Sequence, residues 1–146
     1  MAKKTLKIDY TDDFDFMLIG ISSGSKDFKL CHFLNVALGK NFVRTGDHEL
    51  IMGKNNSSVQ FSKFVFDDEQ GHNYILVGNK SNDVYLIPEL KNMDYFLLIQ
   101  PSASIEANGL LEQINAIDLV QAVFLIDVNT LKSKYNFLAS IPPKGE

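Results

Sequence analysis

The sequence has few of the residues that cross-link or anchor a chain. One of its 146 residues is cysteine, four are proline and none is tryptophan. Because Cys31 is alone, an intramolecular disulfide is excluded, and a reducing compartment such as the cytosol is expected. No apolar run reaches the roughly 20 residues that cross a bilayer, and the lysine-containing N-terminus lacks the apolar segment of a signal peptide. We therefore expect a cytoplasmic protein without a membrane segment.

The sequence is also short of positive charge. Its 14 lysines and arginines are outnumbered by 18 aspartates and glutamates, which gives a formal net charge of −4. This balance argues against nucleic acid or an anionic membrane as the main partner. The hydrophobic content of 45% is ordinary for a globular protein, and the 11 phenylalanines favour an aromatic-rich sheet. We predict one domain over residues 1–141, followed by a mobile tail at 142–146.

The most informative stretch that is present is a long apolar segment interrupted by proline, at residues 86–100. Pro88 lacks a backbone N–H and therefore belongs at the end or edge of a strand, and it favours an extended Ile87. After a polar bend, residues 95–99 form an almost unbroken apolar run, which is typical of a strand buried on both faces. We predict that this run is the central strand of a sheet.

The rest of the pattern predicts an α+β fold, because runs of period two alternate with runs of helical period. Strands are expected at 14–21, 41–52 with a kink at Gly46–Asp47, 59–66, 73–78, 84–87 and 119–127, and helices at 26–38, between 104 and 118, and from 129 or 130. The economical arrangement is an antiparallel or mixed sheet covered by two helices. It resembles the ferredoxin-like βαββαβ plan, with extra middle strands and a short C-terminal helix.

Polar residues and glycine mark where these helices should begin and end. The expected caps are Ser25 and Gly39 for the first helix, Ser104 or Asn108 at the start of the second, and Asn129 or Thr130 at the start of the third.

Separate blocks of the sequence resemble one known family. Ile87-Pro88-Glu89 is followed, after three residues, by Met93-Asp94-Tyr95. This is similar to the signature of the IPExxxVDY family of small Bacteroidota proteins, with Met93 in place of the valine. Residues 15–21 and 29–35 extend the resemblance, which covers most of the chain. It implies a cytoplasmic bacterial domain without an established activity, and it assigns no catalytic or ligand-binding role to any residue.

Glu89 and Asp94 are the first candidates for chemistry, because they bracket the proline bend. Two carboxylates could hold a divalent cation or divide acid and base roles. The simpler interpretation is that both accept hydrogen bonds from nearby loops and are structural. No histidine lies near them in sequence to complete a metal site, so we expect no metal and no cofactor.

The turn after the first predicted strand is the second candidate. Gly20, Ser22, Ser23, Gly24 and Ser25 run into a helix, and such a turn exposes backbone N–H groups that suit an anion. The spacing is not that of a phosphate-binding loop. By analogy with ligand-sensing ACT domains, these residues could bind a small regulatory ligand, although an ordinary capped turn is the simpler interpretation.

The other reactive side chains form no catalytic pattern. Cys31 and His32 are neighbours on a predicted helix, so their side chains point about 100° apart and cannot form a catalytic dyad. Cys31 lies on the apolar stripe of that helix, which is typical of an inert core thiol. His48 and His72 fall near predicted turns and should be solvated. Residues 63–66 have a faint similarity to an RNA-stacking strand, but an acidic stretch follows them. Nothing in the sequence therefore supports an enzyme, although an enzyme is still possible because catalytic residues need not be neighbours in sequence.

Two hypotheses follow from the sequence. The leading one is a non-enzymatic protein-interaction or scaffold domain that could form a homodimer, because the strands at 95–99 and 119–126 are very apolar and a sheet edge can pair with a second copy. The alternative is an ACT-like ligand-sensing module that uses the turn at 20–25. A pocket lined by that turn would favour sensing, and a broad apolar edge without a cavity would favour assembly.

Overall fold

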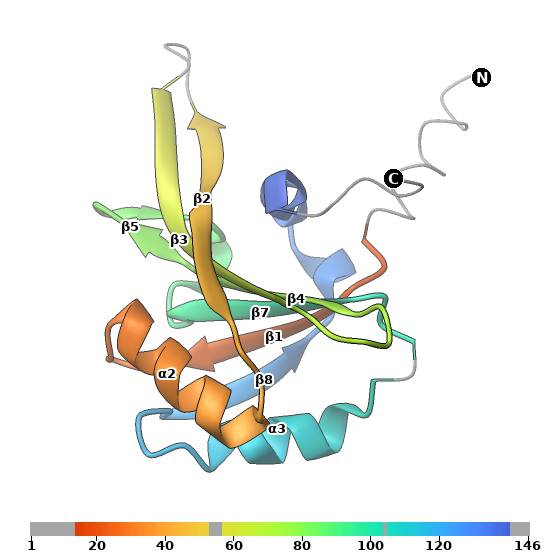
Figure 1. Ribbon diagram of the computed structural model, residues 1–146. Helices are drawn as coiled ribbons and strands as arrows, with labels where there is room; N and C mark the ends of the chain where they lie inside the picture. Colours follow the sequence, from red (N-terminus) through yellow and green to blue (C-terminus); the bar gives the residue numbers. More distant parts are fainter. Residues whose placement is uncertain (1–13, 53–56, 104, 141–146) are drawn as a thin grey trace, which may run out of the picture.

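The computed structural model describes residues 14–52, 57–103 and 105–140, and the predicted tail at 142–146 lies outside them (Figure 1). Its elements, with η for 3₁₀-helices, are β1 (Met17–Ser22), α2 (Asp27–Leu38), β2 (Val43–Met52), β3 (Ser57–Asp67), β4 (Asn73–Gly78), β5 (Lys80–Ser81), β6 (Val84–Tyr85), η1 (Pro88–Leu90), β7 (Tyr95–Gln100), α3 (Ala107–Asn115), β8 (Ala122–Ile126), η2 (Val128–Thr130) and η3 (Lys134–Ser140).

Six of the strands form one sheet in the order β2-β3-β4-β7-β1-β8, and each neighbouring pair is antiparallel. β5 and β6 form a separate two-stranded hairpin. The α+β class predicted from the sequence is therefore confirmed. The pairing of β2 with β3 shifts between Arg44 and Asp47, so the kink predicted near Gly46 is also found.

β7 is enclosed on both faces, as its unbroken apolar sequence predicts. All of its residues from Tyr95 to Ile99 are buried, and it lies between β4 and β1. Its side chains alternate between two hydrophobic clusters. Tyr95, Leu97 and Ile99 share a cluster with residues of α2 and α3, whereas Phe96 and Leu98 share the second cluster with the proline bend and η3.

Each face of the sheet is thus covered by different material (Figure 1). The helix side contains Leu30 and Leu34 from α2 and Ile114 from α3. The opposite side is filled by Ile87, Met93 and Phe137, among others, which come from irregular or 3₁₀ segments. A strand buried on both faces needs a layer of residues on each face, and only one of these two layers is α-helical.

The first helix ends as the sequence predicts but begins one residue away from the predicted cap. Gly39 has φ 64° and terminates α2 in the left-handed conformation, which glycine adopts without a steric penalty. At the other end Lys26, not Ser25, occupies the N-cap position, and no side chain caps it. The hydroxyl of Ser25 was expected there because serine is a common cap.

The caps of the later helices also differ from the prediction. The carboxylate of Glu106 caps α3 by accepting a hydrogen bond from Gly109 N at 2.7 Å, so Asn108 lies inside the helix, while Ser104 is outside the described residues. Asp127 caps η2 in the same way. Asn129 and Thr130 therefore lie inside η2 and do not cap it. Asp127 has a short acceptor side chain, like asparagine and threonine, and it precedes both of them in the chain, so it takes the N-cap position.

Candidate functional site

The proline bend at residues 86–94 is held in place by Asn79, which sequence analysis did not single out. This side chain is fully buried at the end of β4. Its Nδ2 donates to the carbonyl oxygens of Leu90 at 2.9 Å and Met93 at 2.8 Å, and its Oδ1 accepts from Ile87 N at 2.8 Å. One amide therefore satisfies three backbone groups of an irregular segment that is packed against the sheet.

Glu89 joins this bend to the C-terminal part of the chain. Its Oε2 accepts from Ser133 N at 2.8 Å and its Oε1 accepts from the Ser133 hydroxyl at 2.9 Å. Partial burial raises the pKa of Glu89, but hydrogen bonds from Ser133, from Lys132 N and from its own backbone N–H outweigh this and leave the pKa lowered. Glu89 is ionised and acts as a clamp between η1 and the segment that leads into η3.

Asp94 is bound to a different part of the molecule. Its Oδ2 accepts from Ser23 N at 2.7 Å, while its backbone N–H donates to Ile21 O at 2.8 Å. Glu89 and Asp94 thus hold two separate loops and share no partner. Among the described residues no group of three or more histidine, cysteine, aspartate or glutamate side chains is placed to hold a metal ion.

A polar pocket of about 360 Å³ lies where the turn after β1 meets the start of β7. Ser23, Gly24 and Ser25 line it, together with Lys26 and Asp94. The hydroxyl of Tyr95 donates to Ser25 O at 2.6 Å beside it. Burial, with the negative charges of Asp27 and Asp94, raises the pKa of Tyr95 to about 12, so this donor keeps its proton at neutral pH.

The structure brings only part of the predicted ligand turn into this pocket. Gly20 lies inside β1, paired with Phe96 and Phe124, and a Cβ at that position would come within 2.6 Å of the Met93 sulfur. Its role is close packing against Met93. The backbone oxygen of Ser22 accepts from Gln121 N at 2.8 Å, next to the pairing of β1 with β8, and Ser22 does not line the pocket.

His48 and His72 are not solvated as the sequence suggested. His48 is 1% exposed, and its Nε2 lies 2.6 Å from Asn136 O, so this nitrogen carries the proton and donates it. Burial lowers the pKa of His48, with help from Lys63, against the opposing effect of the bond to Asn136. The sequence places His48 on a strand near a predicted turn, and this local pattern does not predict that η3 covers its side chain.

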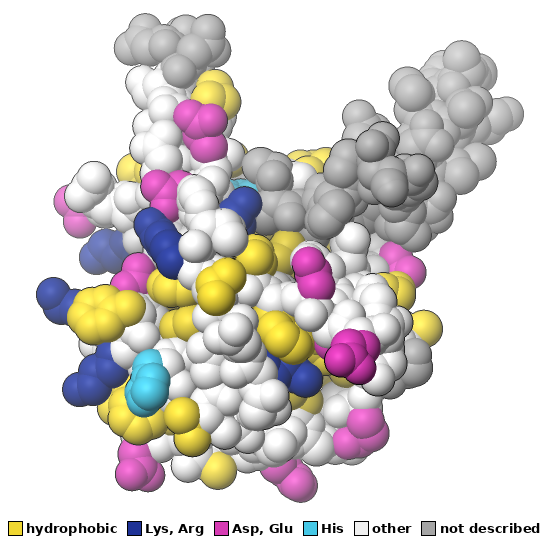
Figure 2. All heavy atoms as spheres, in the orientation of Figure 1, with side chains coloured by type: hydrophobic (Ala, Val, Ile, Leu, Met, Phe, Trp, Pro, Cys, Tyr) yellow, Lys and Arg dark blue, Asp and Glu magenta, His cyan; other side chains and the backbone are white. Residues whose placement is uncertain are grey.

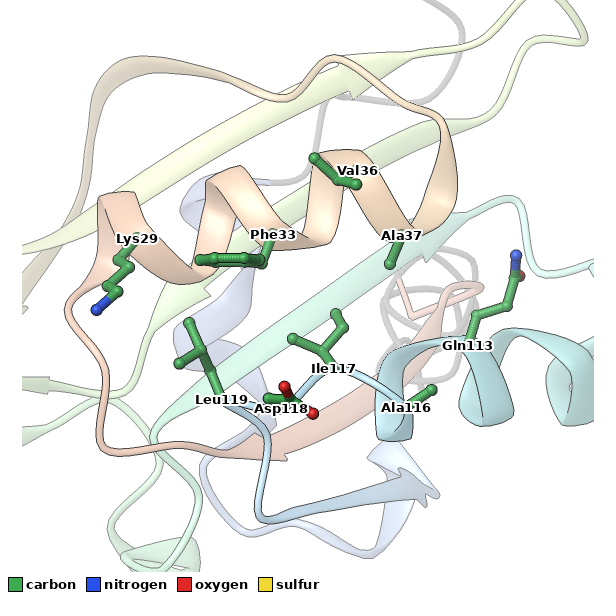
Figure 3. A pocket seen from close by; sticks show the side chains of 9 residues that line it. All are labelled: Lys29, Phe33, Val36, Ala37, Gln113, Ala116, Ile117, Asp118 and Leu119. Carbon is green, nitrogen blue, oxygen red and sulfur yellow. The ribbon is translucent and has the colours of Figure 1, made fainter.

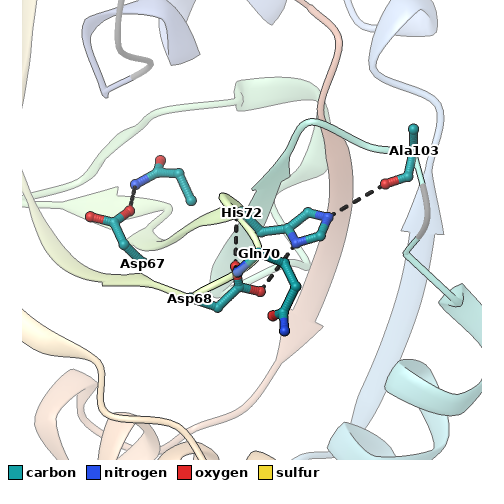
Figure 4. Close-up of polar contacts among 6 residues, drawn as sticks. Asp67, Asp68, Gln70, His72 and Ala103 are labelled. Atoms are coloured by element: carbon teal, nitrogen blue, oxygen red, sulfur yellow. Dashed lines mark hydrogen bonds and ion pairs between the residues drawn. The ribbon is translucent and has the colours of Figure 1, made fainter.

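His72 is half-buried in the β3–β4 hairpin, where its Nδ1 lies 3.1 Å from Asp68 Oδ2 (Figure 4). Asp68 also accepts from Gln70 N and His72 N, so it organises the turn. Partial burial raises the pKa of Asp68, but these hydrogen bonds and His72 outweigh it and lower that pKa. The hydrogen bonds of this pair close the hairpin.

Cys31 is buried on α2, as its helical spacing predicts. Burial, together with the negative charge of Asp27, raises the pKa of Cys31 to about 11. A thiol that stays protonated at neutral pH is a poor nucleophile and a poor metal ligand. Cys31 is therefore an inert core thiol.

An apolar groove of about 450 Å³ lies between α2 and the end of α3, and the sequence did not predict it (Figure 3). Phe33, Val36 and Ala37 form one wall, while Ile117 and Leu119 form the other. Hydrophobic side chains gather over α2 on this face of the molecule (Figure 2), because Phe33 and Val36 are exposed there.

A second exposed apolar feature is the outer strand β8. Among the residues that the structure describes, it is the last strand of the sheet and pairs with β1 alone. Phe124 is 49% exposed and Leu125 is 52% exposed. Successive strand residues point to opposite faces, and Val123 packs in the helix-side cluster whereas Ile126 packs in the other. Leu125 therefore lies on the helix side of the edge and Phe124 on the opposite side.

We predict that Asn79→Ala destabilises the protein by about 3 kcal/mol, because it leaves three backbone groups of the bend without partners in the interior. Asn92→Ala, at an exposed position of the same bend, is the matched control and should change stability by less than about 0.5 kcal/mol. Urea unfolding of both variants measures the difference. Equal effects of the two substitutions would show that Asn79 does not hold the bend.

Glu89→Gln should destabilise the protein at neutral pH by about 0.5–1 kcal/mol, since the clamp is exposed and loses its charge. A lowered folded-state pKa stabilises the fold above the unfolded value of about 4.3, and this contribution disappears as pH falls through the folded value. The stability gap between wild type and variant should therefore close in acid. Unfolding measured from neutral to acidic pH tests this, with exposed Glu69→Gln as control. A gap that persists in acid would contradict it.

Comparison with protein-family models, with curated proteins and with solved structures finds no match to this chain. Among the described residues, no helix has the length and apolar content required to span a membrane.

Proposed function

We propose that this chain is a non-enzymatic protein-interaction domain whose binding surface is the edge strand β8. The observation that supports it is the chemistry of that edge. The sequence of β8 is AVFLI, without a charge, a proline or a glycine, and its Phe124 and Leu125 are about half exposed. An uncovered apolar edge presents unpaired backbone N–H and C=O groups and invites another strand.

The opposite edge of the sheet strengthens this assignment by contrast. β2 contains Arg44, Asp47 and Glu49, and its pairing is shifted between the first two of them. Charged residues and bulges are the features by which natural sheets protect an edge from other chains. One edge of the same sheet is protected in this way and the other is not, which is the distribution expected when β8 is reserved for a partner.

The remaining features support a structural role for the signature residues. Glu89, Asp94 and Met93 tie the bend to the C-terminal segment, the first turn and β1 respectively. On this basis the resemblance to the IPExxxVDY family, which we retain as a proposal, describes a framework and not reactive groups. An enzymatic role has no comparable support in the described part of the chain.

We also infer a ferredoxin-like plan for the core of the sheet. β1 and β4 are both antiparallel to β7, which lies between them, and β7 and β8 have the same relation to β1. Each pair is joined through a helix, so β1-α2-β4-β7-α3-β8 follows the βαββαβ order. In this interpretation the β2–β3 hairpin is an insertion that extends the sheet at the protected side.

Site-specific photocrosslinking in the native cells tests the interaction surface. A benzophenone amino acid in place of Leu125 should give a covalent adduct with another polypeptide, because this side chain would be covered by the partner. Val43 on the edge strand β2 is the matched control, since it is 48% exposed against 52% for Leu125, and it should give none. Equal yields at both positions, or no adduct at Leu125, would overturn β8 as the interaction surface.

A second candidate function is ACT-like sensing of a small ligand, and the pocket of about 360 Å³ lined by Ser23, Gly24 and Ser25 favours it. This volume is at the lower end of ordinary small-molecule sites, about 300–1,000 Å³. Lys26 and Lys80 on one hand, and Asp27 and Asp94 on the other, give the pocket both signs of charge, which suits a zwitterion such as an amino acid.

Gly24 offers a direct test of the pocket, because no atom lies within 4 Å of a Cβ built there. If the pocket binds an amino acid or a nucleotide, a saturating ligand should raise Tm by ~5 °C. Gly24→Leu should abolish the shift, whereas Gly46→Leu, at another open position, should retain it. A panel of amino acids and nucleotides that shifts nothing, or a shift that survives Gly24→Leu, would exclude this candidate.

A further inference from the structure

We infer that the partner of β8 is a second copy of this chain, paired antiparallel about a two-fold axis at Phe124. This inference rests on the function proposed above and adds the identity of the partner. Two copies would then join their sheets into one continuous sheet. A two-fold axis normal to the sheet keeps α2 and α3 of both copies on the same face, so the helix layers also become continuous.

The first argument is the length of the match. Antiparallel self-pairing about such an axis must place one residue opposite its own copy, and the choice of that residue sets the register. With Phe124 at the centre, all five residues of β8 are paired: Phe124 with its copy, Val123 with Leu125, and Ala122 with Ile126. A centre at any other residue of β8 leaves at least two residues of each strand outside the pairing.

The second argument is the chemistry of the residues that would meet. Leu125 of each copy would lie across from Val123 of the other on the helix side, and the two Phe124 rings would meet on the opposite side. Aromatic and branched pairs are among the favourable cross-strand pairs. The most exposed side chains of β8 are therefore the ones that this register covers, on both faces of the sheet.

The third argument concerns charge at the ends of the pairing. Asp127 directly follows β8 and Gln121 directly precedes it, and both are exposed. In the register centred on Phe124, Asp127 of one copy falls opposite Gln121 of the other, where an amide can donate to a carboxylate. The two aspartates stay apart at opposite ends of the seam, so like charges do not face each other across the axis.

Sedimentation of the full chain tests whether the partner is a second copy. The wild type should be dimeric at about 100 µM, and Leu125→Lys should weaken dimerisation on the order of 100-fold, because it places a lysine on each side of the axis. Val43→Lys, the matched change on β2, should leave the dimer intact. Circular dichroism checks that both variants are folded.

Cysteine crosslinking tests the register, because the one native thiol, Cys31, is buried. Facing residues in an antiparallel pair have Cβ atoms about 5 Å apart, which permits a disulfide, whereas diagonal neighbours are about 7–8 Å apart. Phe124→Cys should therefore give a covalent dimer on oxidation. Leu125→Cys, whose copy is a diagonal neighbour, should give much less, and Val43→Cys none.

The outcomes separate this inference from the proposed function. A wild type that stays monomeric overturns the second copy as partner, yet an adduct at Leu125 with a different polypeptide would still support the interaction surface. A dimer that survives Leu125→Lys overturns β8 as the seam. A dimer lost in Leu125→Lys, with crosslinking stronger at Leu125→Cys than at Phe124→Cys, overturns the register centred on Phe124.

Discussion

The structure depends on the enclosure of β7 on both faces. A central strand with no exposed side chain between Tyr95 and Ile99 requires a complete cover above and below the sheet. The helices supply one cover. The other is built from segments with little regular structure, whose backbone groups have no helix or sheet to satisfy them. Asn79 and Glu89 meet this requirement by binding backbone N–H and carbonyl groups of the proline bend and of the segment that leads into η3.

This constraint explains why the polar side chains of the proline bend have partners within the fold. A proline and two carboxylates on a bend look like a candidate for chemistry, but Glu89 binds Ser133 in the second cover and Asp94 binds Ser23 in the turn after β1. The Met93 side chain of the bend occupies the space where a Cβ of residue 20 would lie. The bend can therefore pack against β1 only because residue 20 is glycine. The C-terminal 3₁₀ segment is held by Glu89 at one end and by His48 at Asn136.

The enclosed centre also makes the unprotected edge conspicuous. The sheet buries its middle strands thoroughly, and one edge carries charges and a bulge, yet β8 presents Phe124 and Leu125 on its two faces. Exposed apolar side chains scattered over a surface are ordinary. On β8 they lie on an edge strand without a charge, so the same strand can offer backbone hydrogen bonds and apolar contacts to one partner.

The sequence by itself determined the regular elements, because these depend on local periodicity. The unbroken run at 95–99 identified the buried strand, Gly39 the end of α2, and Gly46–Asp47 the irregularity of β2. The caps of α3 and η2 were missed, since several polar residues compete for such positions and the sequence does not rank them. Only the tertiary structure decided the roles of Asn79 and His48, the groove between α2 and α3, and the exposure of β8. Asn79 binds partners 8–14 residues away, but which backbone groups it reaches depends on the irregular path of the bend. The other features depend on segments that meet across 40 or more residues of chain, as with Glu89 and Ser133 or His48 and Asn136, and the local sequence pattern does not predict such contacts.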